Sequence, residues 1–376
     1  MEGGVRVVIA GLDLGLDDRG RYRIDGESEV KFRRCRAGLS ALSCPDVIEA
    51  DRLSKTFVVH KKEPGLRGSL KALFRRERIE KHAVREASFR VDEGEIVGLV
   101  GANGAGKTTL VKMLAGIIHP TGGEARVLGF RPWERENRLR RQIALIMGQK
   151  AQLWWDLPAA DSFLLLREIY RISDAQYRET LDYLSGILNV KEQLQIQVRR
   201  LSLGERMKME LIAALLHSPR VVYLDEPTIG LDLTAQRAIR DFLLQYRERH
   251  RPAMILTSHY MEDIERLCRR IIILREGEIV FDGSLEKVVE TYADHKVVTV
   301  QLAKTAPPVG DAPELRALGE VDVCGDGVIK LRVSRGRVAD VAGELLRRYP
   351  VADLAIEEAD VGTIIEKILR EREGPP

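Results

Sequence analysis

The sequence lacks the features that mark secreted, membrane-spanning or nucleic-acid-binding proteins. Its four cysteines are scattered over 376 residues without a CxxC pair, which argues against a disulfide framework or a zinc site and favours a reducing cytoplasm. No apolar run reaches the roughly 18 residues that a membrane-spanning helix needs, so no direct membrane span is expected. The 60 basic residues nearly balance the 57 acidic ones, so we expect no nucleic acid as the main partner.

The amino-terminal segment differs in composition from the rest of the chain. Residues 1–45 are rich in Gly, Arg and Asp, and their apolar stretch is broken by Asp13, so a secretory signal is not indicated. We expect a poorly ordered extension here, with an over-long start assignment as the alternative. If the protein acts at a membrane, a second polypeptide must supply the spanning helices.

Beyond this segment the sequence has the patterns of an α/β protein. Helical patterns alternate with short β-branched runs such as IALIM, VVYLD, AMILTS and RIIIL, which predicts a mostly parallel sheet. Residues 47–59 indicate strand, turn and strand. Residues 61–82 form a basic insert, which is either a solvated excursion or a contact with anionic lipid headgroups or a partner.

A change of composition after Tyr292 predicts a second, smaller domain. Its apolar runs and turns indicate the order strand–helix–strand–strand–helix–strand with a closing helix, which resembles a split βαβ, ferredoxin-like α+β domain. The predicted organisation is therefore an extension over 1–45, a main α/β domain over 46–293 and an accessory domain over 294–376.

The most specific motif is a glycine-rich loop. Residues 101–108 read GANGAGKT and match GxxxxGK[ST] between an apolar strand (95–100) and a helix expected over 108–118. Glycines let backbone N–H groups converge on phosphate, and the helix N-terminus adds positive charge. Lys107 would reach the β- and γ-phosphates, and Thr108 would offer its hydroxyl to Mg²⁺. The predicted nucleoside triphosphate site comprises Gly101, Ala102, Asn103, Gly104, Ala105, Gly106, Lys107, Thr108 and Thr109.

A second motif, VVYLDEP, places two carboxylates at the end of an apolar strand (221–225). Asp225 would bind Mg²⁺ through water, and Glu226 would orient or deprotonate an attacking water. Such a pair alone is usually an ordinary loop start, but beside the phosphate loop it indicates hydrolysis. A binding module without hydrolysis is disfavoured because Glu226 is present.

A second anion-binding helix start is indicated over residues 201–216, LSLGERMKMELIAALL. Ser202 can cap this helix beside Gly204, and the packed side of the helix is expected to carry Met207, Leu211, Ala214 and Leu215. The phosphate loop already holds one nucleotide. This second site would therefore serve a nucleotide held by another subunit.

The order of these motifs resembles that of the ATP-binding cassette (ABC) family. GANGAGKT, Gln149, LSLGE, VVYLDEP, GLD (230–232) and SH (258–259) follow in the family's order over residues 47–290. The resemblance implies a P-loop ATPase with a RecA-like core and with antiparallel-β and α-helical subdomains. It also implies a head-to-tail dimer, in which each ATP is held by one phosphate loop and by the 202–204 segment of the other chain.

Position by position, the resemblance implies further roles. Gln149 looks like the glutamine that reaches Mg²⁺ and the attacking water, and His259 looks like the switch histidine at the γ-phosphate. Asp232 looks like the aspartate of the cross-dimer loop. Phe57 takes the place of the aromatic that stacks on adenine, or is a core strand residue. The implied catalytic set is Gln149, Glu226 and His259, and the implied Mg²⁺ ligands are Thr108, Gln149 and Asp225.

Two residues depart from the family's usual LSGGQ signature, because Leu203 and Glu205 replace Gly and Gln. A carboxylate near phosphate is unfavourable unless it points away, so we assign Glu205 no nucleotide contact.

The motif set looks most like that of ATP-binding subunits of type-two ABC exporters, of the multidrug/daunorubicin-resistance-like and viologen-exporter-like kinds. This implies a membrane permease as partner at the cytoplasmic face of the cell membrane. Trp154 and Trp155 would suit the docking surface or belong to the core. The alternative is a soluble ABC ATPase in iron–sulfur assembly or on the ribosome. A neighbouring gene with about six apolar spans would favour transport.

Overall fold

The computed structural model describes residues 7–9, 12–16, 22–23, 47–60, 78–148, 150–293, 295–303, 313–325, 327–358 and 360–370. The chain divides into two compact units, Met1–Ser43 and Cys44–Pro376. In the first unit, β1 (Val7–Ile9), β2 (Leu12–Leu16) and β3 (Tyr22–Arg23) form a three-stranded antiparallel sheet. The rest of the expected extension lies outside the described residues.

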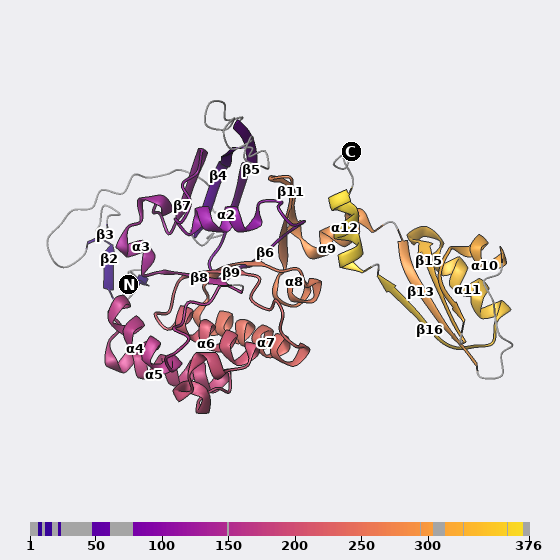
Figure 1. Cartoon of the computed structure of the whole chain (residues 1–376). Helices are drawn as coiled ribbons and strands as arrows, with labels where there is room; N and C mark the ends of the chain where they lie inside the picture. Colours follow the sequence, from indigo (N-terminus) through magenta and orange to yellow (C-terminus); the bar gives the residue numbers. More distant parts are fainter. Residues whose placement is uncertain are drawn as a thin grey trace, which may run out of the picture. The chain divides into compact units, whose positions relative to one another are not determined.

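A six-stranded sheet forms the centre of the second unit, in the order β12-β11-β6-β10-β9-β8 (Figure 1). Five strands run parallel and β12 runs antiparallel against β11, which confirms the predicted mostly parallel sheet. The strands are β6 (Ile96–Gly101), β8 (Ile143–Met147), β9 (Val221–Asp225), β10 (Ala253–Thr257), β11 (Arg270–Arg275) and β12 (Glu278–Ser284).

Both faces of this sheet pack against a hydrophobic core, as the side chains of β9 show. Val222 and Leu224 pack into the core on one face, whereas Val221 and Tyr223 pack into the core on the other. Successive side chains of a strand point to opposite faces, so a strand covered on both sides must be apolar throughout.

Helices and a second sheet supply the two covers (Figure 1). The core on one face includes residues of α4 (Ala159–Tyr170), α5 (Asp174–Ile187), α6 (Leu203–Leu215), α7 (Leu233–His250) and α8 (Met261–Leu267). The core on the other includes residues of α2 (Lys107–Leu114), α3 (Asn137–Arg140) and the antiparallel sheet β5-β4-β7.

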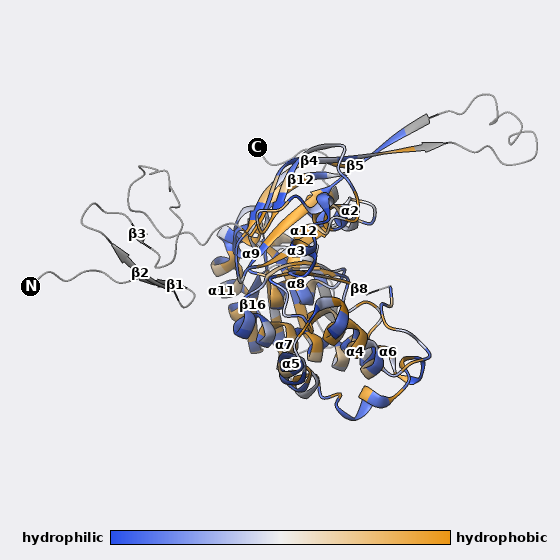
Figure 2. Ribbon diagram, turned by 90° about the vertical axis from the view of Figure 1, so that its left-hand side faces the viewer, coloured by the Kyte–Doolittle hydropathy of each residue, from blue (hydrophilic) through white to orange (hydrophobic). Residues whose placement is uncertain are grey.

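The antiparallel sheet corrects two expectations. Its strands are β4 (Ile48–His60), β5 (Arg78–Val91) and β7 (Gly122–Val127). The predicted strand–turn–strand is wrong, because β4 is one strand that absorbs a φ of 47° at Arg52 and several register shifts. Residues 78–82 of the expected insert also belong to β5, since Arg78 pairs with His60. The two strands run out together from the body of the unit (Figure 2), while residues 61–77 lie outside the described residues.

The helix after the glycine loop is shorter than the sequence predicts. It ends at Leu114 rather than near residue 118, and Gly116 follows with a φ of 72°. A Cβ at Gly116 would lie 2.2 Å from the carbonyl oxygen of Pro132. The left-handed glycine therefore ends the helix and lets the next segment approach closely.

Residues 295–358 form a four-stranded antiparallel sheet with two helices and their own apolar core. The element order is β13 (His295–Leu302), α10 (Pro313–Leu318), β14 (Glu320–Gly325), β15 (Val328–Ser334), α11 (Val338–Arg348) and β16 (Val351–Glu358), and the sheet order is β14-β15-β13-β16. The ferredoxin-like assignment and the domain boundaries stay predictions.

The closing helix α12 (Val361–Arg370) packs elsewhere than this sheet. Ile364, Ile365 and Ile368 are buried in the same core as Val288 of α9 (Leu285–Tyr292). The Arg275 guanidinium donates a hydrogen bond of 3.1 Å to the carbonyl oxygen of Ile368. Helix α12 therefore packs into the core of the six-stranded sheet.

Candidate nucleotide-binding site

The glycine loop joins β6 to α2, as the motif requires. The helix is capped by Gly106 at a φ of 108°, with no side chain bonded to its first N–H groups and no acidic residue in its first turn. Cβ atoms at Gly101 and Gly106 would lie 2.3 Å and 2.2 Å from carbonyl oxygens of β11 and β5. At Gly104 the same atom would meet nothing within 4 Å. The loop therefore packs closely against β11 and β5 at Gly101 and Gly106, whereas it is open at Gly104.

Lys107 folds back over this loop. Its ammonium donates hydrogen bonds to the carbonyl oxygens of Gly101 (2.6 Å) and Ala102 (3.1 Å), and the residue is 6% exposed. Burial lowers the pKa of Lys107, while the negative charges of Glu226 and Asp225 oppose that shift. The ammonium is thus held beside the loop that would receive phosphate.

Oxygen atoms meet at the start of α2 and the end of β9. The Thr108 hydroxyl donates to the Asp225 carboxylate at 3.0 Å, and the Thr257 hydroxyl donates to Asp225 Oδ1 at 2.7 Å. Hydroxyl and carboxylate oxygens are the hard ligands that Mg²⁺ prefers, so this donor set fits the ion. Among the described residues, no group of three or more His, Cys, Asp and Glu side chains is placed to hold a metal on its own.

Glu226 follows directly in an unusual backbone conformation. Its φ is 57°, and its N–H donates to the carbonyl oxygen of Thr257 at 3.0 Å. This strained turn brings its carboxylate to His259, whose Nε2 lies 2.7 Å from Glu226 Oε1. The structure therefore brings Glu226 and His259 together from the ends of adjacent strands. Gln149 lies outside the described residues.

The predicted second anion site forms the start of α6. Ser202 caps the helix as expected, and all four residues predicted on the packed side are buried. A Cβ at Gly204 would lie 3.0 Å from the Cβ of Ala235 in the first turn of α7. The 202–204 segment therefore lies against the segment that Asp232 begins, and Asp232 Oδ1 caps α7 by accepting from Ala235 N–H at 2.8 Å.

Phe57 is a surface residue of β4 and is 36% exposed. The Lys55 ammonium lies 5.2 Å from its ring centroid. The alternative reading of Phe57 as a core residue is wrong, and its ring is accessible for stacking.

A buried network of charged and polar side chains was not predicted from the sequence. Asp263 of α8 is wholly buried, lies 2.7 Å from Arg240 Nε of α7 and accepts from the Ser258 hydroxyl at 2.7 Å. It also accepts from Thr228, two residues past Glu226, while Ser258 immediately precedes His259. The network thus ties together the two loops that carry Glu226 and His259. The sequence signal that could have predicted this network is the position of Asp263 on the apolar face of α8, beside Ile264 and Leu267.

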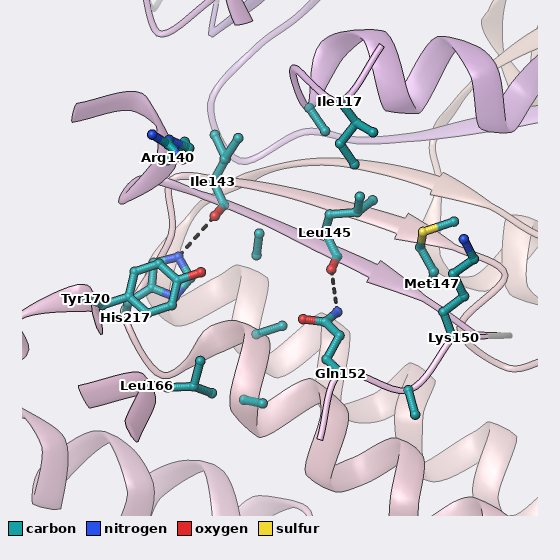
Figure 3. Close-up of a pocket in the computed structure, with 15 residues that line it drawn as sticks. Ile117, Arg140, Ile143, Leu145, Met147, Lys150, Gln152, Leu166, Tyr170 and His217 are labelled. Atoms are coloured by element: carbon teal, nitrogen blue, oxygen red, sulfur yellow. Dashed lines mark hydrogen bonds between the residues drawn. The ribbon is translucent and has the colours of Figure 1, made fainter. Parts of the chain in front are cut away.

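A pocket of about 440 Å³ lies beside the segment that follows Gln149 (Figure 3). His217 and Tyr170 stack there with ring centroids 3.9 Å apart, and His217 Nε2 lies 3.1 Å from the carbonyl oxygen of Ile143. Burial lowers the pKa of His217 to about 4, so the ring is neutral near pH 7. Elements β8, α4 and α6 supply much of the lining.

The adjoining tryptophans are exposed. Trp154 is 47% and Trp155 is 52% accessible, so the alternative that places either in the core is wrong. The Arg206 guanidinium covers the Trp155 ring at 5.0 Å. The following helix, α4, also exposes the large apolar side chains of Leu164, Leu165 and Ile169.

The strand–loop–helix around Lys107, with its carboxylates at the neighbouring strand end, defines a P-loop nucleoside triphosphatase. Comparison with known proteins then identifies the family. The family model "ABC transporter" matches residues 84–229, and the model "EvrA-like ABC transporter, C-terminal domain" matches residues 294–357. The chain belongs to the ABC transporter ATP-binding proteins, and its fold is that of the ABC ATPases.

The chain covers most of the length of two relatives. The ABC transporter ATP-binding protein NatA of Bacillus subtilis is 31% identical over 209 residues, which is 56% of this chain and 85% of NatA. The Nod factor export ATP-binding protein I of Burkholderia thailandensis is 31% identical over 251 residues, 65% of this chain and 81% of that protein.

Two solved structures share the fold. An ATP-binding subunit of an ABC transporter is 25% identical with a TM-score of 0.54, covering 65% of this chain and 93% of that one. A dimeric ATP-binding cassette bound to ADP and Pi in a post-hydrolysis state is 21% identical with a TM-score of 0.52, covering 63% and 98%.

Proposed function

We propose that this ABC ATPase binds Mg-ATP at the start of α2, hydrolyses it within a head-to-tail dimer and drives a separate membrane permease, as an exporter. The observation that carries the proposal is the gathering of five functional side chains at the carboxyl ends of β6, β9 and β10. These are Lys107, Thr108, Asp225, Glu226 and His259.

The phosphates would be held by the loop's backbone N–H groups from Gly101 to Thr109 and by the Lys107 ammonium. Mg²⁺, which neutralises phosphate charge when bound, would be held by Thr108, Asp225 and Gln149. Phe57 would stack on the adenine. The support is that Thr108 and Asp225 already touch and that the loop is open at Gly104.

Hydrolysis would depend on the strained turn after β9. Glu226 would accept a proton from the attacking water, and the neighbouring His259 would contact the γ-phosphate. Together with Lys107 and Gln149, His259 would stabilise the charge that develops on the transferred phosphoryl group. The buried Asp263 would act as a positioning residue for both loops.

The second half of each site would come from another copy of the chain. Ser202 and Gly204 would meet the γ-phosphate across the interface, and Asp232 would lie in the facing loop. The solved post-hydrolysis cassette with ADP and Pi is a dimer, which supports this arrangement.

A permease would dock on the exposed apolar surface around the pocket, at the cytoplasmic face of the cell membrane. Trp154, Trp155 and the exposed leucines of α4 have the aromatic and apolar character of interface cores. No helix in the described ranges is long and apolar enough to cross a bilayer. Export is supported by the similarity to the Nod factor export ATP-binding protein I.

The first test substitutes the proposed base. Glu226→Gln should keep ATP affinity within about threefold but lower the hydrolysis rate at least about 100-fold, since general-base catalysis supplies that range. Glu248→Gln, on the exposed side of α7, is the matched control and should hydrolyse normally. Turnover of Glu226→Gln at the wild-type rate would remove Glu226 from this role.

The second test concerns the permease. When the chain is expressed with the membrane protein encoded by an adjacent gene, Trp154→Ala with Trp155→Ala should reduce co-purification by about tenfold, as expected for aromatic anchors. ATP hydrolysis by the isolated chain should not change. Leu346→Ala, on the exposed face of α11, is the control. Undiminished co-purification would contradict docking at this surface.

A further inference from the structure

The start of α6 is occupied by a side chain of its own first turn. Glu205 Oε2 accepts from Ser202 N–H at 2.9 Å and from the Ser202 hydroxyl at 2.8 Å, while Glu205 N–H donates to Ser202 Oγ at 3.2 Å. This is a complete capping box. The carboxylate of Glu205 thus binds both donors of Ser202.

Both hydrogen-bond donors of Ser202 are therefore already bonded to Glu205. A serine hydroxyl has one hydrogen to donate, and here that hydrogen is directed to a carboxylate. The Ser202 N–H points to the same oxygen. A phosphate oxygen needs these donors, because phosphate at neutral pH accepts hydrogen bonds and repels a neighbouring negative charge.

The carboxylate is ionised in this position. The hydrogen bonds from the Ser202 backbone and side chain lower the pKa of Glu205, with smaller contributions from the Gln193 side chain and the charge of Lys208. Ser202 is exposed and Glu205 is half-buried, so a partner's phosphate could reach them. A glutamine would close the same capping box without a charge, so the helix itself does not require an acid here.

We propose that Glu205 is an internal competitor for the γ-phosphate of the ATP held by the partner chain. In the free chain its carboxylate occupies the positive end of α6 and takes the donors of Ser202. Closure of the dimer then requires the carboxylate to leave them, which raises the ATP concentration needed for dimerisation. The inference rests on the head-to-tail arrangement proposed above, and it makes Glu205 a residue that sets the ATP dependence of closure.

The experiment compares Glu205→Gln with wild-type residue 205, both in the Glu226→Gln chain so that ATP persists. Light scattering measures dimer formation against ATP concentration in the presence of Mg²⁺. We expect Glu205→Gln to lower the half-maximal ATP concentration at least about threefold, because in each of the two chains a neutral amide replaces the charged carboxylate and holds the Ser202 donors more weakly. ATP binding to the isolated monomer should not change.

The control removes the same charge from a similar helix start. Ser284 caps α9 and accepts from Lys287 N–H at 3.2 Å, and Glu286 lies in the first turn of that helix. Glu286→Gln should leave the ATP dependence of dimerisation unchanged. An equal shift in Glu286→Gln would show that net charge, rather than Glu205, is responsible and would overturn the inference.

Two further outcomes separate the inference from the proposed function. If the Glu226→Gln chain dimerises with ATP and Glu205→Gln has no effect while folding normally by circular dichroism, the competitor role is overturned and the dimer stands. If the Glu226→Gln chain does not dimerise at saturating ATP, the dimer proposal falls and the inference falls with it.

Discussion

The N-termini of α2 and α6 are capped in opposite ways. At α2, the cap is a glycine, no side chain bonds the first N–H groups and no acid lies in the first turn. At α6, the cap is Ser202, and Glu205 closes it from within. Every helix start carries partial positive charge and unpaired N–H groups, so either can attract an anion. One start is left open for an external anion, and the other carries its own.

This difference suggests an order of events. A nucleotide can enter the open start of α2 in a single chain, where Lys107 is already held beside the loop. The start of α6 has to exchange an internal carboxylate for a phosphate. Binding would therefore come first, and closure of two chains would follow as a separate step with its own free-energy cost.

The largest expected effect comes from displacing the glycine loop at the start of α2. In Gly106→Ala, the added Cβ would lie 2.2 Å from the carbonyl oxygen of Ala83 at a φ of 108°. The loop must shift, so we expect ATP affinity to fall more than about tenfold, along with a loss of several kcal/mol of unfolding free energy.

Gly104→Ala is the matched control for this change. It also has a positive φ, 82°, but its Cβ would meet nothing within 4 Å. We expect it to lose only about 1 kcal/mol of unfolding free energy. Urea unfolding compares the two variants, and equal losses would show that the packing behind the loop is not what demands glycine at 106.

The next largest effect comes from blocking the second start. Ser202→Arg places a long side chain where the partner's phosphate would approach, so ATP-driven dimerisation of the Glu226→Gln chain should fall at least about tenfold. Binding of ATP by the single chain should stay within about twofold, because the α2 site is untouched. Loss of monomer binding would contradict the assignment of the two starts to two different chains.

The smallest effect distinguishes the two caps by their response to acid. The pKa of Glu205 is lowered in the folded chain, so its contribution to stability is present above its ordinary value of 4.5 and is lost as pH falls through the folded pKa. The α2 cap has no titrating group. The melting temperature of wild type relative to Glu205→Gln should therefore fall as the pH drops below about 4.5. A difference independent of pH would contradict the ionised cap.

Much of the site could be predicted from the sequence because its residues follow parallel strands. Such strands end at one edge of a sheet, so the loops carrying Lys107, Asp225, Glu226 and His259 had to meet there. The apolar runs of β9 and β10 and the glycines of the loop were sufficient signals.

Three other features were not predicted from the sequence. Glu205 was assigned no nucleotide contact, and the capping box that it forms with Ser202 was missed, although the Ser-x-x-Glu spacing is its signal. Asp263 finds partners on α7 and on a loop 35 residues earlier in the chain. The sequence predicts that α12 has an apolar face, but it does not predict which core this face packs into. Contacts between distant segments decide where Asp263 and α12 pack, whereas the contact of Glu205 with Ser202 spans only three residues.

The measurement that tests this account most directly is a structure of the Glu226→Gln chain with Mg-ATP. The account predicts a two-fold dimer in which each γ-phosphate contacts Lys107 of one chain and Ser202 of its partner, with Glu205 swung off the serine. Nucleotide held by Lys107 while Ser202 faces solvent and stays bonded to Glu205 would contradict it.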